Sequence, residues 1–180
     1  SHGLAAKQYP YEASVGVPTL VAGPGIAGGT VIDEPVCTED LLPTLLGLAG
    51  LRGRAGLPGA DLAGLLQGRD APPDRPGVML ELVYETRPNQ PFHRCIWRAF
   101  RSRRYRYDVA GDGTGMRPWQ FFDLEADPHE LTNLINSPAH RPVIAEHHAW
   151  LRARMAETLD DAALAPAWNQ PALNVEWQEA

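Results

Sequence analysis

The sequence predicts a mixed α/β protein in two parts, and three observations lead to this expectation. Residues 1–70 contain a short apolar run and leucines at helical spacing. Residues 78–165 alternate apolar and polar side chains, as β-strands do, and end in an amphipathic stretch. Residues 71–77, between them, are rich in proline and charge, which is typical of a linker. We therefore expect an α/β part, a linker, an α+β part and an unassigned tail at 166–180.

The first part contains one expected strand and two expected helices. Residues 17–22 form a valine-rich apolar run bounded by Gly23, which predicts a strand buried on both faces. Thr38 and the two acids after it predict a helix start, because a hydroxyl caps free amides and acids favour the N-terminal end. Leucines follow up to a stop at Gly50. Residues 61–66 predict one or two further helical turns.

Alternation with a period of two dominates the second part. It predicts strands at residues 78–84, 94–102, 105–109 and 119–124, the middle two joined by a turn at Arg103 and Arg104. We expect this hairpin to turn its aromatic side chains inward and its arginines toward water. A last helix is expected from Pro142, with apolar side chains three and four residues apart. His147 and His148 are adjacent on it, so they cannot face one metal together and are expected to be structural or surface residues.

Composition and charge argue against several classes of protein. The 180 residues carry a formal net charge of −6, which argues against a nucleic-acid partner despite the arginines between 98 and 106. No apolar run reaches the length of about 18 residues that a membrane span needs. Cys37 and Cys95 lie far apart and predict neither a zinc site nor a disulfide framework. We expect a soluble protein and leave its compartment open between the cytoplasm and the periplasm or exterior.

Four blocks of residues occur in the order found in sulfatases of the alkaline-phosphatase superfamily. Residues 2–18 resemble the family's His-Gly-Leu-x-x-Lys followed by Tyr-Glu-x-Ser-x-x-Val-Pro, and residues 40–50 its Asp-Leu-x-Pro-Thr-Leu-Leu-x-Leu-Ala-Gly helix. Residues 97–107 and 121–134 resemble its Arg-x-x-Arg-Thr-x-x-Tyr-Lys-Tyr strand pair and its Leu-Tyr-Asp-Leu-x-x-Asp-Pro-x-Glu-x-x-Asn-Leu segment. The chain is therefore similar to the C-terminal portion of a sulfatase.

The resemblance implies a fold and a division into domains. Residues 1–70 would be the end of an alkaline-phosphatase-like α/β catalytic domain, followed by the linker at 71–77. Residues 78–165 would be the small α+β subdomain of the family, an antiparallel sheet with a C-terminal helix.

The resemblance also assigns active-site roles. Lys7 stands where the family has a lysine that contacts the anionic group, and a fixed ammonium there favours the charge that develops during hydrolysis. His2 is a candidate for substrate binding, as are His93 and Arg94, because sulfatases use loops of the small subdomain to close the pocket. The alternatives are an exposed loop lysine for Lys7, a structural role for His2 and an ordinary connection at 85–94.

The segment after Lys7 is expected to be anchored by Tyr11 and Glu12 against the strand that follows it, with Glu12 paired to a backbone amide or a cation. The family often has arginine or another polar residue before Val-Pro, where this chain has Gly16. Any contact made by that side chain is lost here.

In activity, the resemblance implies a hydrolase of sulfate esters that uses a formylglycine and a divalent cation, calcium in most of the family. Neither the Cys/Ser-x-Pro-x-Arg nucleophile motif nor the paired metal acids occur in this chain, so we expect both upstream of Ser1 and no metal site here. Asp123, Asp127 and Glu130 lack the spacing of a calcium loop and are expected to be structural.

Further expectations follow for substrate, partner and activity. The substrate would be a small-molecule or saccharide sulfate ester, the partner a missing N-terminal catalytic portion, and the 180 residues alone inactive. The alternatives are a phosphodiester or phosphonate-ester hydrolase of the same superfamily, and a non-catalytic binding module from a split gene.

Overall fold

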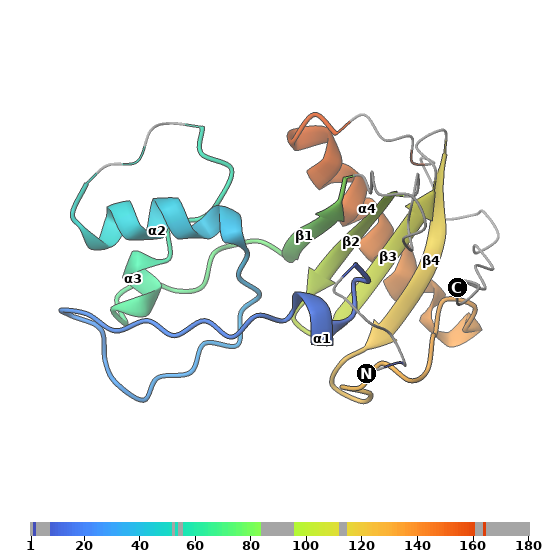
Figure 1. The fold of residues 1–180 in the computed structure, drawn as a ribbon, viewed down its shortest axis with the longest axis horizontal. Coiled ribbons are helices and arrows are strands. Elements are labelled where there is room, and N and C mark those ends of the chain that lie inside the picture. Colours follow the sequence, from blue (N-terminus) through green and yellow to red (C-terminus); the bar gives the residue numbers. More distant parts are fainter. Residues whose placement is uncertain are drawn as a thin grey trace. The chain divides into compact units, whose positions relative to one another are not determined.

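A computed structural model describes residues 2, 8–51, 53, 56–83, 96–111, 115–160 and 164 (Figure 1). The chain divides into two compact units, one of residues 18–78 and one that combines residues 1–17 with residues 79–180. The chain therefore leaves the second unit after Val17 and returns to it at Met79. The assignment of residues 1–70 and 78–165 to a catalytic domain and a subdomain stays a prediction.

The unit of residues 18–78 is built on two short helices. A turn of 3-10 helix, η1 (Thr38–Asp40), leads into α2 (Leu41–Leu48), and α3 (Ala63–Leu66) follows. Gly50 ends the helical region with a φ of 70°, a left-handed conformation that glycine adopts without steric cost. The helix predicted from Thr38 to Gly50 and the helical turns predicted at 61–66 are thus confirmed. The expected capping by the Thr38 hydroxyl was wrong, because Cys37 precedes the first turn and the Asp40 carboxylate bonds to its amide.

Asp40 ties the expected linker to these helices. Its buried carboxylate accepts hydrogen bonds from the Arg75 guanidinium at 2.6 and 2.8 Å, from the Ala60 amide at 2.8 Å and from the Cys37 amide at 2.9 Å. Burial alone would raise the pKa of Asp40, but these donors lower it to about 2. The ion pair of Asp40 and Arg75 is therefore charged on both sides at neutral pH.

The strand predicted at residues 17–22 is absent, so that prediction was wrong. Val17, Leu20 and Val21 lie in extended backbone without a strand assignment and are 72%, 98% and 42% exposed. The prediction took an apolar run to be buried on both faces. Burial of that kind needs neighbouring strands to bond the backbone, and none of the described strands pairs with this segment.

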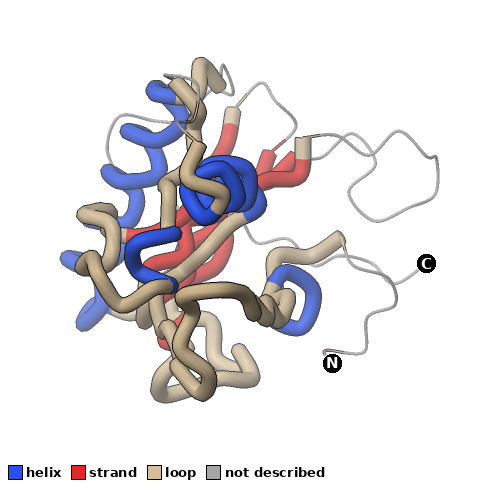
Figure 2. The backbone as a smooth tube through the Cα atoms, turned by 90° about the vertical axis from the view of Figure 1, so that its left-hand side faces the viewer, coloured by secondary structure: helices blue, strands red, loops and turns tan. Residues whose placement is uncertain are grey.

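The second unit is a four-stranded sheet with helices on both faces (Figures 1 and 2). The strands lie in the order β1, β2, β3, β4, with β2–β3 and β3–β4 antiparallel. The long helix α4 covers one face, preceded by the short turn η2, and the short helix α1 covers the other. The bounds are α1 Glu12–Val15, β1 Gly77–Leu82, β2 Ile96–Ser102, β3 Tyr105–Gly111, β4 Met116–Asp123, η2 Pro138–His140 and α4 Arg141–Glu157.

These elements confirm the predicted α+β pattern of the second part. The hairpin turns at Arg103 and Arg104 as expected, and Pro142 stands in the first turn of α4. β4 begins three residues earlier than predicted, at Met116, and β1 one residue earlier, at Gly77. Among the described residues, no helix combines the length and the apolar character that a membrane crossing requires.

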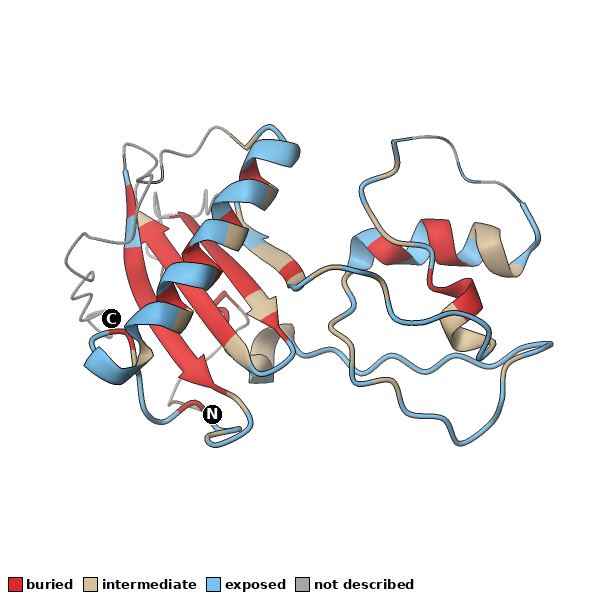
Figure 3. Ribbon diagram, turned by 180° about the vertical axis from the view of Figure 1, so that it is seen from behind, coloured by how far each residue is buried: buried red, intermediate tan, exposed pale blue. Residues whose placement is uncertain are grey.

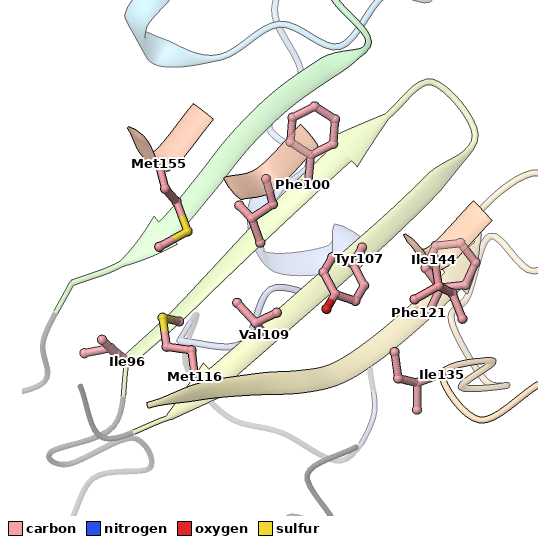
Figure 4. Packing of buried hydrophobic residues seen from close by; sticks show 10 residues of the cluster. Ile96, Phe100, Tyr107, Val109, Met116, Phe121, Ile135, Ile144 and Met155 are labelled. Carbon is pink, nitrogen blue, oxygen red and sulfur yellow. The ribbon is translucent and has the colours of Figure 1, made fainter. Parts of the chain in front are cut away.

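Alternation along the strands separates two apolar cores, one on each face (Figure 3). The helix-side core contains the buried residues Ile96, Phe100, Tyr107, Val109, Met116, Phe121, Ile135, Ile144, Leu151 and Met155 (Figure 4). The opposite core contains Tyr9, Trp97, Ala99, Ala110 and Trp119, against which Tyr11 and Val15 of the N-terminal segment pack.

A β-bulge keeps Met116 and Phe121 of β4 on the same face of the sheet. Asp108 pairs with Gln120 while its neighbour Val109 pairs with Pro118, so Trp119 is an extra residue on β4. Side chains alternate along a regular strand, and residues an odd number apart would point to opposite faces. Met116 and Phe121 nevertheless share the helix-side core, because the extra residue reverses the alternation between them.

Two arginines of the hairpin, Arg98 and Arg106, are buried, which corrects the expectation that the arginines face water. Arg98 and Arg106 are only 4% and 0% exposed. The expectation assumed a sheet with one solvated face, but α4 covers one face and the N-terminal segment covers the other. Buried cations need partners, and Arg98 has one in Asp160, at 2.5 Å from Nε.

Candidate functional site

Of the four residues expected in the active site, His2 is the one that lies within the described residues. Its ring stacks on Tyr11 with 3.9 Å between the centroids and 12° between the planes. Lys7, His93 and Arg94 lie outside the described residues. The segment Gln8–Val15, which begins directly after Lys7, is described and shows how this region is fixed.

The backbone of this segment is bonded at two points to the C-terminal part of the same unit. The indole Nε1 of Trp97 donates to the carbonyl oxygen of Gln8 at 2.8 Å, and the amide of Glu12 donates to Glu130 Oε2 at 2.9 Å. Both bonds use backbone atoms of the segment, so they fix its path directly. We call Gln8–Val15 the anchored segment.

Side chains of the anchored segment add further bonds. Arg101 Nε donates to Glu12 Oε1 at 2.8 Å, and Gln120 Nε2 donates to the hydroxyl of Tyr11 at 2.9 Å. The expectation that Tyr11 and Glu12 anchor this region, with Glu12 paired to a cation, is confirmed. The expected partner was wrong: the two residues bond to Arg101, Gln120 and Glu130, not to a strand directly after them.

Beneath the segment lies a buried cation. The Nε atom of Arg106 is 3.0 and 3.1 Å from the two carboxylate oxygens of Asp108, and Nη1 bonds to Glu130 Oε1. The guanidinium carbon lies 5.3 Å from the ring centroid of Tyr11 and 5.0 Å from that of Phe122, so two aromatic rings add cation–π attraction. We call Arg106, Asp108 and Glu130 the buried ionic cluster.

The cluster holds two carboxyl groups for one guanidinium, and this imbalance shifts their titration. Burial raises the pKa of Asp108 to about 7, although Arg106 pulls it down. Burial also raises the pKa of Glu130, against the same cation and the Glu12 amide. One proton is therefore retained by the carboxyl pair close to neutral pH. Because the three side chains are at most 2% exposed, the cluster supplies position and charge and not a reacting group.

Glu130 takes an unusual backbone conformation to reach this place. Its φ is 57°, in the left-handed region that residues other than glycine, asparagine and aspartate rarely occupy. Such a conformation persists where surrounding contacts impose it. Here the contacts are Arg106 on one carboxylate oxygen and the Glu12 amide on the other.

The other polar groups that the sequence singled out have structural roles. Asp123 accepts two bonds from Arg104, at 2.9 and 2.7 Å, and Asp127 accepts the Thr132 amide at 2.8 Å. Both histidines of α4 are buried; His147 Nε2 lies 2.8 Å from Ser102 Oγ, and His148 Nδ1 lies 2.9 Å from the Tyr107 hydroxyl. In the part of the chain that the structure describes, no group of three His, Cys, Asp or Glu side chains is arranged to hold a metal ion.

The buried ionic cluster was missed as a unit by sequence reasoning. One signal was present, since Arg106 and Asp108 are two residues apart in a strand and must share a face. Glu130 was expected to be structural, but nothing in the sequence links it to Glu12, 118 residues earlier.

Comparison with known proteins gives consistent matches along the chain. The family model described as N-sulphoglucosamine sulphohydrolase, C-terminal, matches residues 1–157. An ulvan-active sulfatase from Formosa agariphila is 33% identical over 159 residues, which are 86% of this chain and 29% of that protein. The solved structure of a 2-O GAG sulfatase is 32% identical with a TM-score of 0.65, over 78% of this chain and 29% of that one.

A phosphonate monoester hydrolase of Agrobacterium radiobacter is also similar in structure, with a TM-score of 0.53 over 68% of this chain and 25% of that one. At 24% identity this likeness shows the fold alone. The chain spans about 29% of the length of the sulfatases named above.

Proposed function

The chain belongs to the sulfatase family as its C-terminal portion, and from this premise we propose that it completes a hydrolase of sulfate esters. The observation that carries the proposal is that the family match runs through residues 1–157, which include Lys7 and the anchored segment directly after it. A lysine needs a fixed backbone if its ammonium is to meet a substrate at a defined point.

In this proposal Lys7 contacts the sulfuryl oxygens and stabilises the charge that develops on them as the ester bond breaks. Composition supports a special role, because Lys7 is the single lysine among 16 basic residues of the chain. A compact ammonium and a planar guanidinium are not interchangeable as donors. His2, His93 and Arg94 are proposed to contact the rest of the substrate.

The nucleophile and the metal are proposed to come from outside these 180 residues. Sulfatases use a formylglycine and a divalent cation, calcium in most of the family, and together these supply the attacking oxygen and hold the sulfate. The buried acids Asp108 and Glu130 do not fit a metal ion, because Arg106 and the Glu12 amide already take their oxygen atoms and both side chains are closed to solvent. This chain's own part is to place Lys7 and to form the small subdomain.

A saccharide sulfate ester is the substrate class we propose. Two similar proteins carry names that refer to ulvan and to a 2-O GAG sulfatase. A phosphonate or phosphodiester substrate is the second candidate, favoured only by the fold-level likeness to the phosphonate monoester hydrolase.

The test is the exchange of Lys7 in the full-length enzyme. Lys7→Ala is expected to lower kcat by about a hundredfold to a thousandfold with a smaller change in KM, because the lost charge acts mainly in the transition state. Lys7→Arg is expected to restore only part of this loss. The measurement is steady-state kinetics on a sulfated disaccharide and on an aryl phosphonate.

The matched control is Arg69→Ala, which removes an exposed cation that bonds to Gln67. Its kinetics are expected to equal those of the wild type. Retention of more than about half of wild-type kcat by Lys7→Ala, less than 1 kcal/mol of barrier, contradicts the role of Lys7. Faster hydrolysis of the phosphonate contradicts the sulfate assignment.

A further inference from the structure

We propose that Glu130 and Trp97 are positioning residues for the reaction, because they hold the anchored segment by its backbone on either side of Tyr11. The inference rests on the proposed role of Lys7. Neither residue was expected in the site, and neither is assumed to touch the substrate.

The two backbone bonds lie at defined points of the anchored segment. The Trp97 indole holds the carbonyl of Gln8, the residue that follows Lys7, and Glu130 holds the amide of Glu12. A bond to a backbone atom fixes the course of the chain whatever side chain stands there. The described end of the Lys7 region is thus tied to a rigid strand, β2, and to the loop after β4.

Glu130 is itself held in place. Arg106 bonds to one of its carboxylate oxygens and leaves the other for the Glu12 amide. Arg106 in turn is fixed by Asp108 and by the rings of Tyr11 and Phe122. A buried ion pair of this kind is poor evidence for stability, since apolar residues of equal volume often stabilise a protein as well or better. It does impose one geometry on the segment.

The backbone at Glu130 is strained. Its φ of 57° is unfavourable for a glutamate, and this strain is concentrated at the residue that meets the anchored segment. A purely space-filling role would be met by an apolar side chain in an ordinary conformation. The strained backbone here places the carboxylate between Arg106 and the Glu12 amide.

The experiment is a double-mutant cycle in the full-length enzyme. Glu130→Gln turns one of the two carboxylate oxygens into an amide nitrogen, so either Arg106 or the Glu12 amide loses its acceptor. We expect kcat to fall on the order of tenfold to a hundredfold with KM changed less than about twofold, as for a displaced catalytic group. In a Lys7→Ala background the same substitution is expected to change kcat less than about threefold, because the group that it positions is gone.

Trp97→Phe repeats the cycle by removing the donor to Gln8 while keeping a buried aromatic ring, and it carries the test if Glu130→Gln does not fold. Arg104→Gln is the control: it breaks an Arg–carboxylate pair in the same hairpin, with Asp123, that does not touch the anchored segment. It is expected to leave kcat unchanged in both backgrounds.

Two outcomes separate the inference from the proposed function. If Lys7→Ala lowers kcat but Glu130→Gln and Trp97→Phe lower it equally in both backgrounds, or not at all, the positioning role is overturned and the role of Lys7 stands. If Lys7→Ala leaves kcat unchanged, the role of Lys7 is overturned, and the positioning role with it.

Discussion

Arg106 faces more negative charge than it neutralises, and this imbalance governs the chemistry of the buried ionic cluster. Two ionised carboxylates beside one guanidinium would leave a net negative charge out of water, which costs several kcal/mol. Retaining a proton on the pair avoids that cost. Asp108 also faces the charge of Glu12, so the nearest charged groups around it are one arginine and two acids.

Replacing Asp108 with asparagine is expected to flatten the pH dependence of the unfolding free energy. The folded protein keeps the Asp108 proton up to about pH 7, whereas the unfolded chain releases it near pH 4. Stability therefore falls as pH rises through this window, with a slope of at most one bound proton. Asp108→Asn removes that slope, which urea unfolding at several pH values between 4 and 7 measures.

Two other groups also contribute to the pH dependence of the unfolding free energy. Glu130, with its raised pKa, keeps part of the falling slope, and His147, whose pKa burial lowers, adds a rising slope in both proteins. Asp123→Asn is the matched control: Arg104 lowers the pKa of Asp123, so Asp123 contributes a pH dependence of stability only below about pH 4 and none between about pH 4 and 7. An identical slope in Asp108→Asn and wild type would falsify the proton assignment.

At this scale the sequence predicts the partners of some charges and not of others. Spacing puts Arg106 and Asp108 on one face of β3, and the Tyr-Glu pair predicts an anchor at Glu12. The covering of that face depends on contacts that span up to 118 residues, which no local pattern encodes. The arginines were therefore expected in water.

α4 is the element that completes the helix-side core. Ile144 and Leu151 are fully buried on its inner face, together with His147, and the rings of Phe100 and Phe121 meet His147 edge-on at 6.2 and 5.6 Å. The histidines take hydrogen bonds within this core, so the inner face of α4 is more polar than its apolar spacing suggests. The buried side chains of this face, apolar and polar together, therefore hold α4 against the sheet.

Leu151→Ala is expected to lower the unfolding free energy by about 2 to 5 kcal/mol, the range for removing a fully buried leucine. Leu131→Ala, at a position that is 78% exposed, is expected to change it by less than about 0.5 kcal/mol. Chemical denaturation with a common m-value measures both. A cost below 1 kcal/mol for Leu151→Ala argues against α4 as a packed element.

Elements whose partners are close in sequence could be predicted, and the others could not. The β2–β3 hairpin and α4 follow from alternation, a turn and a proline. The run at 17–22 has the composition of a buried strand but no described strand beside it, so composition alone gave the wrong result. The bulge at Trp119 was also missed, because one extra residue leaves no mark on a short alternating pattern.

On the scale of the whole molecule, residues 18–78 are inserted between two parts of the other unit. Their apolar side chains are poorly covered: Leu20, Val31 and Leu45 are 98%, 81% and 62% exposed. The unit of residues 1–17 and 79–180 has an apolar core on each face of its sheet. The two units are therefore expected to differ in their resistance to local opening.

Limited digestion with thermolysin, which cuts beside exposed apolar residues, is expected to remove residues 18–78 first. The peptide of residues 8–17 is expected to stay bound to the C-terminal fragment after the connection is cut, because Trp97, Arg101 and Glu130 hold it. Native mass spectrometry of the digest measures this association. Early loss of that peptide would contradict its tight binding to the C-terminal fragment. Preferential survival of residues 18–78 would show that this unit is the more resistant of the two.

The anchored segment gains its partners only late in the synthesis of the chain. A ribosome adds about 5 to 20 residues per second, so the 118 positions between Glu12 and its partner Glu130 take roughly 6 to 24 s to make. Throughout that interval the amide of Glu12 lacks its Glu130 acceptor and bonds to water instead. The part of this chain proposed to act on substrate is therefore fixed in place only well after it is made.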